Sequence, residues 1–320
     1  MNQNAQVPES PFVLERLMRD TQRRYADKDF TSEADFRDQM HQFVDDLPPG
    51  RTARERLDSL AEVPEELAQE LAFQALESAD QAQADELTRR ALEVDARCVD
   101  ALAVRAFLDS ENAAELIEAL EQAVSVGEEA LGDDFLAEFT GDFWPLVRMR
   151  PYLRTSKQLA EVLWTVGRRF DAIELYTDLL DLDPRDHMGN SVLLLGCYLA
   201  MGEVQRSWEL LEEYDDDSAI FKWGWVLCLL LAGSMEEAEE SLREALDTNP
   251  FVAPLLLGMM EPIEGQPAVV TIGSREEAQI CVQIIGEAWE SRPEARMWLH
   301  EQLVAMGMIT LDQDDDDAAH

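Results

Sequence analysis

Residues 148–157 contain four cationic side chains in a chain that is otherwise strongly acidic. They are Arg148, Arg150, Arg154 and Lys157. A local group of guanidinium and ammonium groups attracts carboxylates and phosphates, and arginine can bind a carboxylate through two parallel hydrogen bonds. The cluster therefore indicates a site for an acidic peptide or a carboxylate of a partner. The alternative is that these cations pair with neighbouring acids inside the fold.

Motifs for other chemistries do not occur. The sequence has no G-x-S-x-G, P-loop, dinucleotide-binding or H-E-x-x-H pattern. The consecutive carboxylates Asp215, Asp216 and Asp217 lack the alternating spacing of a calcium-binding loop. We therefore expect no catalytic activity and no cofactor.

The cysteines and histidines are scattered and form no C-x-x-C pair or mixed cluster, so no metal site is expected. The cysteines lie among apolar residues at helical spacing, which favours buried, reduced thiols. They are Cys98, Cys197, Cys228 and Cys281.

The charge balance limits the partners. The chain has 67 acidic and 26 basic residues, for a formal net charge of −41 at pH 7. Such a charge opposes contact with the phosphates of nucleic acid, so we expect no nucleic-acid partner. Two origins stay open: an acidic proteome in a salt-adapted organism, which the even spread of the acids favours, or recognition of a basic partner.

The longest apolar run, Trp225 to Ala232, is too short to span a bilayer. The first residues, MNQNAQVPESPF, lack a basic segment followed by an apolar one, so no secretory signal is expected. These features predict a cytoplasmic protein that does not associate with membranes.

The cations lie at the start of residues 153–186, which have the pattern of a complete helical hairpin. Leu159, Leu163 and Val166 repeat at helical spacing, and Gly167 then allows a left-handed turn. A second apolar stripe follows and ends at Pro184, which cannot donate a backbone hydrogen bond.

The same order of turn glycine, small residues and terminal proline recurs downstream, and Gly202 marks a unit between the two copies. The matched positions are Gly167, Ala172, Leu179 and Pro184 in the first copy, and Gly233, Ala238, Ala245 and Pro250 in the second. One unit is then close to the roughly 34 residues of a tetratricopeptide repeat. We predict an all-α fold, a right-handed superhelical solenoid of tetratricopeptide-like hairpins with N- and C-terminal capping helices.

The rest of the chain is expected to extend or cap this solenoid. Phe12, Leu14, Leu17 and Met18 predict an amphipathic helix near the N-terminus, and a second one is expected after Ser32. The predicted parts are a tail and short helices (1–50), degenerate helical repeats (51–131), an aromatic insert (132–152), three repeats (153–252), capping helices (253–311) and an acidic disordered tail (312–320).

Two details of these parts can be tested locally. In the aromatic insert, Pro145 and Pro151 are expected to interrupt any helix. In the C-terminal part, Ser274 and Glu277 have the spacing of a capping box and predict the start of a helix.

Several strings resemble a group of bacterial and plant tetratricopeptide-repeat proteins that are distantly similar to the suppression-of-tumorigenicity-7 family. The resemblance covers roughly residues 65–300. It is carried by EALG, GDFWPLVRMRPYLR, LAEVLWTVGRRFDAIELYTDLLDLDPRD, YDDDSA and NPFVAPLLLG. It implies an all-helical fold and no particular chemistry.

In tetratricopeptide solenoids the first helix of each hairpin lines a concave groove, so the resemblance also implies where a partner binds. The expected partner-binding residues are Arg148, Arg150, Arg154, Lys157, Glu161, Trp164, Trp223 and Leu227. The two-carboxylate clamp that grips chaperone tails is not matched, because Glu161 stands where its first asparagine would be.

The sequence therefore predicts a noncatalytic adaptor or scaffold that binds a peptide or protein surface in this groove. One alternative is a self-association module that forms a homodimer through the N-terminal or final helices. A second alternative is an acidic mimic of nucleic acid.

Overall fold

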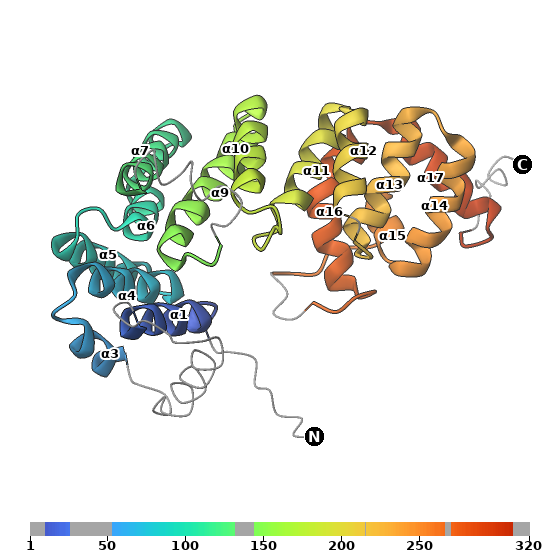
Figure 1. Ribbon diagram of the computed structural model, residues 1–320. Helices are drawn as coiled ribbons and strands as arrows, with labels where there is room; N and C mark the ends of the chain where they lie inside the picture. The colour runs from blue at the N-terminus through green and yellow to red at the C-terminus, as the bar shows by residue number, and fades with distance from the viewer. Residues whose placement is uncertain (1–9, 26–52, 132–143, 215, 266–269, 310–320) are drawn as a thin grey trace, which may run out of the picture. The chain divides into compact units, whose positions relative to one another are not determined.

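The computed structural model describes residues 10–25, 53–131, 144–214, 216–265 and 270–309 (Figure 1). Regular structure in these ranges consists of 15 α-helices and one short 3-10 helix, with no strand, which confirms the all-α class. The chain divides into unit 1, Met1–His187, and unit 2, Met188–His320, and each is described by itself.

The described residues of unit 1 form two N-terminal helices followed by three antiparallel hairpins. The N-terminal helices are α1 (Val13–Tyr25) and α3 (Ala53–Leu60). The hairpins are α4 (Pro64–Glu77) with α5 (Gln81–Val94), α6 (Val99–Asp109) with α7 (Ala113–Leu131), and, after the 3-10 helix η1 (Val147–Met149), α9 (Arg150–Thr165) with α10 (Arg169–Leu182). The first helices of successive hairpins are neighbours, since α6 contacts both α4 and α9. We call the surface that α4, α6 and α9 form the first-helix face.

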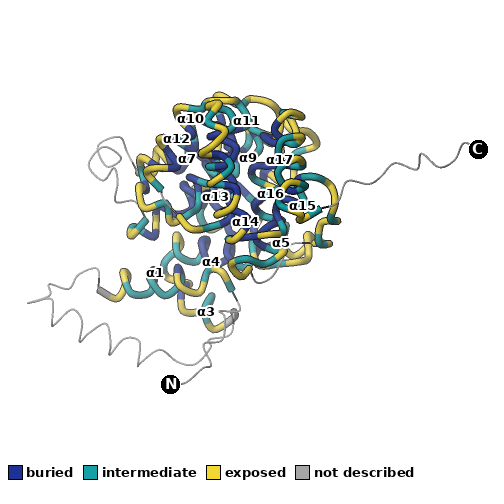
Figure 2. Tube along the Cα trace, turned by 90° about the vertical axis from the view of Figure 1, so that its right-hand side faces the viewer, coloured by how far each residue is buried: buried dark blue, intermediate teal, exposed yellow. Residues whose placement is uncertain are grey.

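Small side chains allow these helices to pack closely. The α4–α5 hairpin buries Ala72, Ala84 and Ala91 around Leu71, and each of these residues is at most 6% exposed. A second cluster joins α6 and α7 to α9 and α10 through Leu120, Leu159 and other apolar residues. Full burial of one leucine contributes roughly 1.5–3 kcal/mol relative to exposure, so the inner sides of the hairpins, dark blue in Figure 2, stabilise the unit.

Unit 2 continues with two more hairpins and then departs from them. The hairpins are α11 (Asn190–Met201) with α12 (Val204–Glu213) and α13 (Ala219–Ala232) with α14 (Met235–Thr248). The last helices are α15 (Val252–Leu256), α16 (Arg275–Glu290) and α17 (Pro293–Ala305). Helix α16 packs against both α11 and α13, so it covers the first helices of this unit (Figure 1).

The local signals for helix ends are confirmed. Gly167, Gly202 and Gly233 have φ angles of 85°, 75° and 80°, and each follows the last turn of a first helix. At the first of these turns the Arg168 N–H donates to the Leu163 carbonyl at 2.9 Å, as in a Schellman motif. Ser274 accepts from the Glu277 N–H at 3.1 Å and begins α16 as predicted.

Some predictions differ from the structure or fall outside it. Pro151 does not interrupt a helix, because it lies in the first turn of α9, where a missing N–H is tolerated. The boundary between the units falls inside the predicted repeat block 153–252. The helix predicted after Ser32, most of the aromatic insert and the acidic tail lie outside the described residues.

Among the described helices, none combines the length and apolar character that are needed to cross a bilayer. This finding concerns the described ranges alone.

Candidate functional site

The Arg150 side chain is buried and makes its contacts within the fold. Its side chain is 6% exposed, and its guanidinium lies 4.1 Å from the centre of the Trp144 ring. Its Nε donates to the Trp144 carbonyl at 3.1 Å. Burial lowers the pKa of Arg150 below its ordinary value. These contacts leave little of this predicted binding residue for a partner.

Arg154 joins three helices by ion pairs. Its guanidinium lies 2.6 Å from Glu15 of α1 and 2.5 Å from Asp100 of α6. Burial alone would lower the pKa of Arg154, but the two carboxylates raise it above the ordinary value. Arg154 is therefore a structural link between α1 and the first-helix face.

The other predicted residues of α9 are half-buried or exposed. Lys157 is half-buried, and burial lowers its pKa. Glu161 is exposed, and Trp164 is half-buried with the Arg169 guanidinium 4.7 Å from its ring centre. These three residues occupy successive turns of α9, so their placement on one helix agrees with the sequence, while partner binding stays a prediction.

Trp223 and Leu227 are core residues of unit 2, which corrects the expectation that they line an open groove. Both are 0% exposed, and the Trp223 ring lies 6.3 Å from that of Trp289 in α16. The sequence of α13, AIFKWGWVLCLLLA, is apolar on nearly all sides. A helix of this kind is buried all round, and that signal indicates a covered position.

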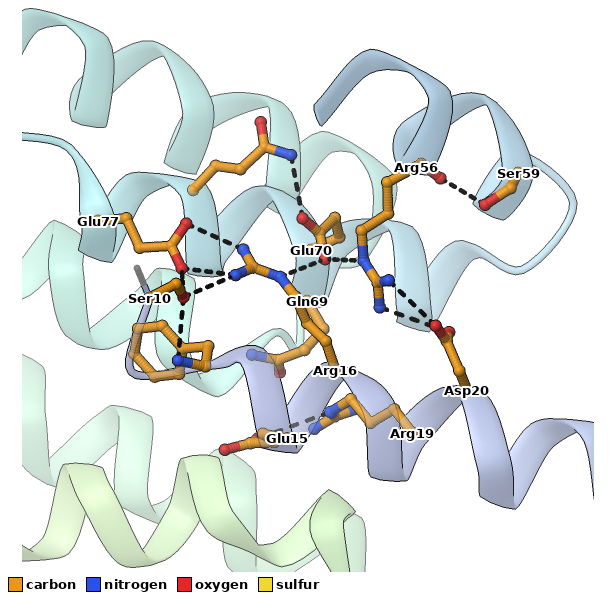
Figure 3. A network of polar contacts seen from close by, with 12 residues as sticks. Ser10, Glu15, Arg16, Arg19, Asp20, Arg56, Ser59, Gln69, Glu70 and Glu77 are labelled. Atoms are coloured by element: carbon orange, nitrogen blue, oxygen red, sulfur yellow. Dashed lines mark hydrogen bonds and ion pairs between the residues drawn. The ribbon is translucent and has the colours of Figure 1, made fainter. Parts of the chain in front are cut away.

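The structure adds a site that the sequence did not indicate, the seat of α1 on the first-helix face (Figure 3). Arg16 pairs with Glu70 through Nε at 3.0 Å and with Glu77 through a terminal nitrogen at 2.5 Å. Arg19 pairs with Glu66 at 3.1 Å. Two arginines of α1 therefore bind three carboxylates of α4.

An aromatic pair completes the seat. Phe12, just before α1, stacks on Phe73 of α4 with ring centres 4.6 Å apart and planes inclined by 19°. The guanidinium of Arg16 lies 5.2 Å from the Phe73 ring centre, within the range of a cation–π contact. Aromatic stacking and charge therefore act at the same place.

Helix α1 differs in part from the predicted orientation, because Phe12, Leu17 and Met18 are half-buried but Leu14 is exposed; most of α1 is coloured intermediate or exposed in Figure 2. Leu14 is 64% exposed and Val13 42%, whereas Glu15 is 4% and Arg19 9% exposed. The carboxylates of α4 explain this orientation, because a buried carboxylate needs a charged partner more than a leucine needs burial. The helix exists as predicted, but its most buried residues are the charged Glu15 and Arg19.

A cleft of about 380 Å³ lies beside α1. Its lining includes Arg19, Glu66, Arg97, Arg148 and Tyr152. Arg148, another predicted binding residue, lines this cleft and is exposed. With both signs of charge and a volume at the lower end for small-molecule sites, the cleft suits a few polar side chains of a partner.

Fold and site together define a protein of antiparallel helical hairpins that holds a further helix on one face by ion pairs and an aromatic stack. Comparison of the chain with models of protein families found no match, and a search of curated proteins found none either. The resemblance to tetratricopeptide-repeat proteins therefore stays a prediction. In the described part of the chain, no three His, Cys, Asp or Glu residues are grouped as metal ligands would be.

Proposed function

We propose that this chain is a noncatalytic adaptor of the tetratricopeptide-repeat type, built as a right-handed solenoid, that binds a segment of another protein on the first-helix face of unit 1. The observation that carries the proposal is the seat of α1. A helix that is distant in sequence from α4 and α9 is held there by four side chains. These four side chains have the i, i+3, i+4 and i+7 spacing by which proteins recognise a bound helix, although three of them are charged.

The nature of the contacts supports a protein segment as the ligand. The seat extends over α4, α6 and α9, because Arg154 of α9 binds both Glu15 of α1 and Asp100 of α6. A surface of this extent can hold a helix of several turns, whereas the adjacent cleft of about 380 Å³ can hold only part of such a helix.

Affinity purification of the full chain from its native host tests this function. The variant Glu66→Arg/Glu77→Arg reverses two charges of the first-helix face, and Glu93→Arg is the control, because Glu93 is an exposed acid on α5. We expect a host protein that is retained by the wild type and by the control but reduced about tenfold or more with the double variant. Identical retention by all three chains would exclude this face.

Self-association is a second candidate, favoured by an apolar surface in unit 2. Met297 is 64% exposed and lines an open cleft of about 390 Å³ with Leu257 and Pro293. Exposed apolar surface of this kind can pair between two copies. Light scattering of the wild type and of Met297→Asp tests it, with a dimer expected for the wild type alone. A wild-type monomer at every concentration would remove this candidate.

A further inference from the structure

We infer that α1 is an internal, displaceable ligand of the first-helix face, and that the external partner is a helix with the same pattern of side chains. That pattern is an aromatic residue at position i, a carboxylate at i+3 and arginines at i+4 and i+7. The inference rests on the proposed function, because it names the partner and the regulation of the same site.

The pattern follows from the register of α1. Phe12, Glu15, Arg16 and Arg19 lie at these four positions and so share one side of a helix. Each of the four has its own counterpart on the first-helix face. Phe12 stacks on Phe73, and Glu15 pairs with Arg154. Arg16 pairs with both Glu70 and Glu77, and Arg19 pairs with Glu66.

The charge of the face favours arginine in the partner. With α1 removed, α4 and α6 present Glu66, Glu70, Glu77 and Asp100, and Arg154 is the cation beside them. Glu70 is 4% exposed, although Arg56 of α3 also binds it at 2.6 Å. A ligand without cations would leave these carboxylates short of partners at a large desolvation cost. Arginine also suits the site better than lysine, since one guanidinium binds Glu70 and Glu77 together.

A comparison of α1 with α16 explains why α1 is the displaceable helix. Both lie against the first helices of their own unit. Helix α16 buries Ala278, Cys281, Ile285 and Trp289, each 0% exposed. Leaving would expose this apolar surface to water. The residues that α1 buries are instead Glu15 and Arg19, while Val13 and Leu14 already face solvent.

The exchange of α1 for a second helix therefore involves little net loss. Ion pairs that α1 gives up are replaced by equivalent ion pairs from the incoming arginines, and the freed arginines of α1 become hydrated. The apolar residues of α1 that lose contacts are Phe12, which stacks on Phe73, and the half-buried Leu17 and Met18, and none of these three is fully buried. The affinity of an external helix is then set by the fraction of molecules in which α1 is away from its seat.

The test uses a labelled synthetic peptide with the sequence of residues 10–25, SPFVLERLMRDTQRRY, and the full chain. Fluorescence anisotropy gives the affinity of this peptide for the wild type and for Arg16→Glu. The substitution places a third carboxylate beside Glu70 and Glu77 and so releases α1. We expect the variant to bind the peptide about tenfold more tightly or better, because the first-helix face is then free.

Two further chains separate release of α1 from unfolding. Arg16→Glu/Glu77→Arg restores an attractive pair, so α1 returns and its amides regain the slow hydrogen exchange of the wild type. Leu14→Ala changes an exposed position of α1 and should behave as the wild type. Hydrogen exchange should show faster exchange of α1 amides in Arg16→Glu and unchanged protection of α4 and α9.

Equal peptide binding by wild type and Arg16→Glu, with α1 amides exchanging fast in the variant, would overturn the inference. A host protein retained equally by these two chains would also overturn it, while leaving the adaptor function intact. If the peptide behaves as expected and no host protein is retained by either chain, α1 is a displaceable ligand of the first-helix face, but the adaptor function fails together with the partner that the inference names.

Discussion

Arg150 and Arg154 lie one turn apart on α9, and the fold uses both. Arg150 packs on Trp144, and Arg154 binds Glu15 and Asp100. With 67 acids for 26 bases, an arginine that becomes buried has many carboxylates available to it. Pairing inside the fold was the alternative interpretation of the cation cluster, and the structure supports it for Arg154. At the scale of the residue, the spacing of the cations in the sequence indicates a patch of positive charge. It does not identify the helix whose carboxylates neutralise that charge.

The cysteines give a prediction at the same scale. All four are free and buried, as the sequence indicated. Burial raises the pKa of Cys98 to about 12 and that of Cys228 to about 11, and it raises the pKa of Cys281 well above its ordinary value of 9.0. Because the thiolate is the reactive form, we expect these thiols to react with Ellman's reagent at pH 8 about a hundredfold more slowly than in the unfolded chain. Rapid reaction of the native chain would contradict their burial.

The contact between α11 and α16 gives a prediction at the scale of the element. A Cβ added at Gly196 would lie 2.6 Å from the Ile284 carbonyl oxygen, which is a backbone atom and cannot turn away. Gly196→Ala should therefore lower the free energy of unfolding by about 1–3 kcal/mol in denaturant titrations.

Gly286→Ala is the matched control for this substitution. A Cβ at that position would meet the Val282 side chain at 3.3 Å, and this side chain can shift. The better helix propensity of alanine also offsets part of the strain. Equal destabilisation by the two substitutions would argue against a close approach of α11 and α16 at Gly196.

Helices and their ends could be predicted from the sequence because their signals are local. Gly167 ends α9, and Ser274 begins α16, through contacts with residues that are close in sequence. The orientation of α1 could not be predicted in this way, because it depends on Glu70 and Glu77, which are distant in sequence. For the same reason, the apolar stripe of α1 did not indicate that Glu15 and Arg19 are its most buried residues and that Leu14 is exposed.

The ion pairs of α1 predict a dependence on pH. Burial alone would raise the pKa of Glu77, but the hydrogen bonds from Arg16 and Ser10 hold it below 4.5. A carboxyl with a lowered pKa stabilises the docked state above its ordinary pKa, and this contribution is lost as the pH falls through the lowered value. Helix α1 should therefore stay docked at neutral pH and lose this contribution as the pH falls below the ordinary pKa of a glutamate, about 4.3.

A fluorophore on Leu14→Cys can report release of α1, because position 14 is exposed and the native thiols are buried. Its anisotropy should fall on acidification. The control Glu77→Gln, which cannot titrate at this position, should show a smaller change. Release on raising the pH from 4 to 7 would contradict the assignment of Glu77.

At the scale of the whole molecule, the repeat pattern predicts the hairpins but not the helices that cover them. Successive hairpins follow from the spacing around Gly167 and Gly233, whereas α1 and α16 reach first helices that are distant in sequence. The division after His187 was not among the predictions. Asp186 and Gly189 have positive φ angles of 51° and 67° there, in a segment without helix between α10 and α11.

The net charge of −41 gives the last prediction, which concerns salt. Repulsion among the surface acids opposes the folded state, and it is screened as the Debye length falls from about 10 Å at 0.1 M to about 3 Å at 1 M ionic strength. The ion pairs of Arg16 and Arg19 are partly buried and are screened less. Raising NaCl from about 0.1 to about 1 M should therefore raise the thermal midpoint by roughly 5 °C, which corresponds to on the order of 2 kcal/mol.

Sucrose at equal osmolality controls for general exclusion effects and should raise the midpoint less. A midpoint that is lower in salt would contradict this prediction and show that attraction between opposite charges, such as the arginine pairs of α1, outweighs repulsion in the folded chain; an unchanged midpoint would contradict it by showing that the two balance.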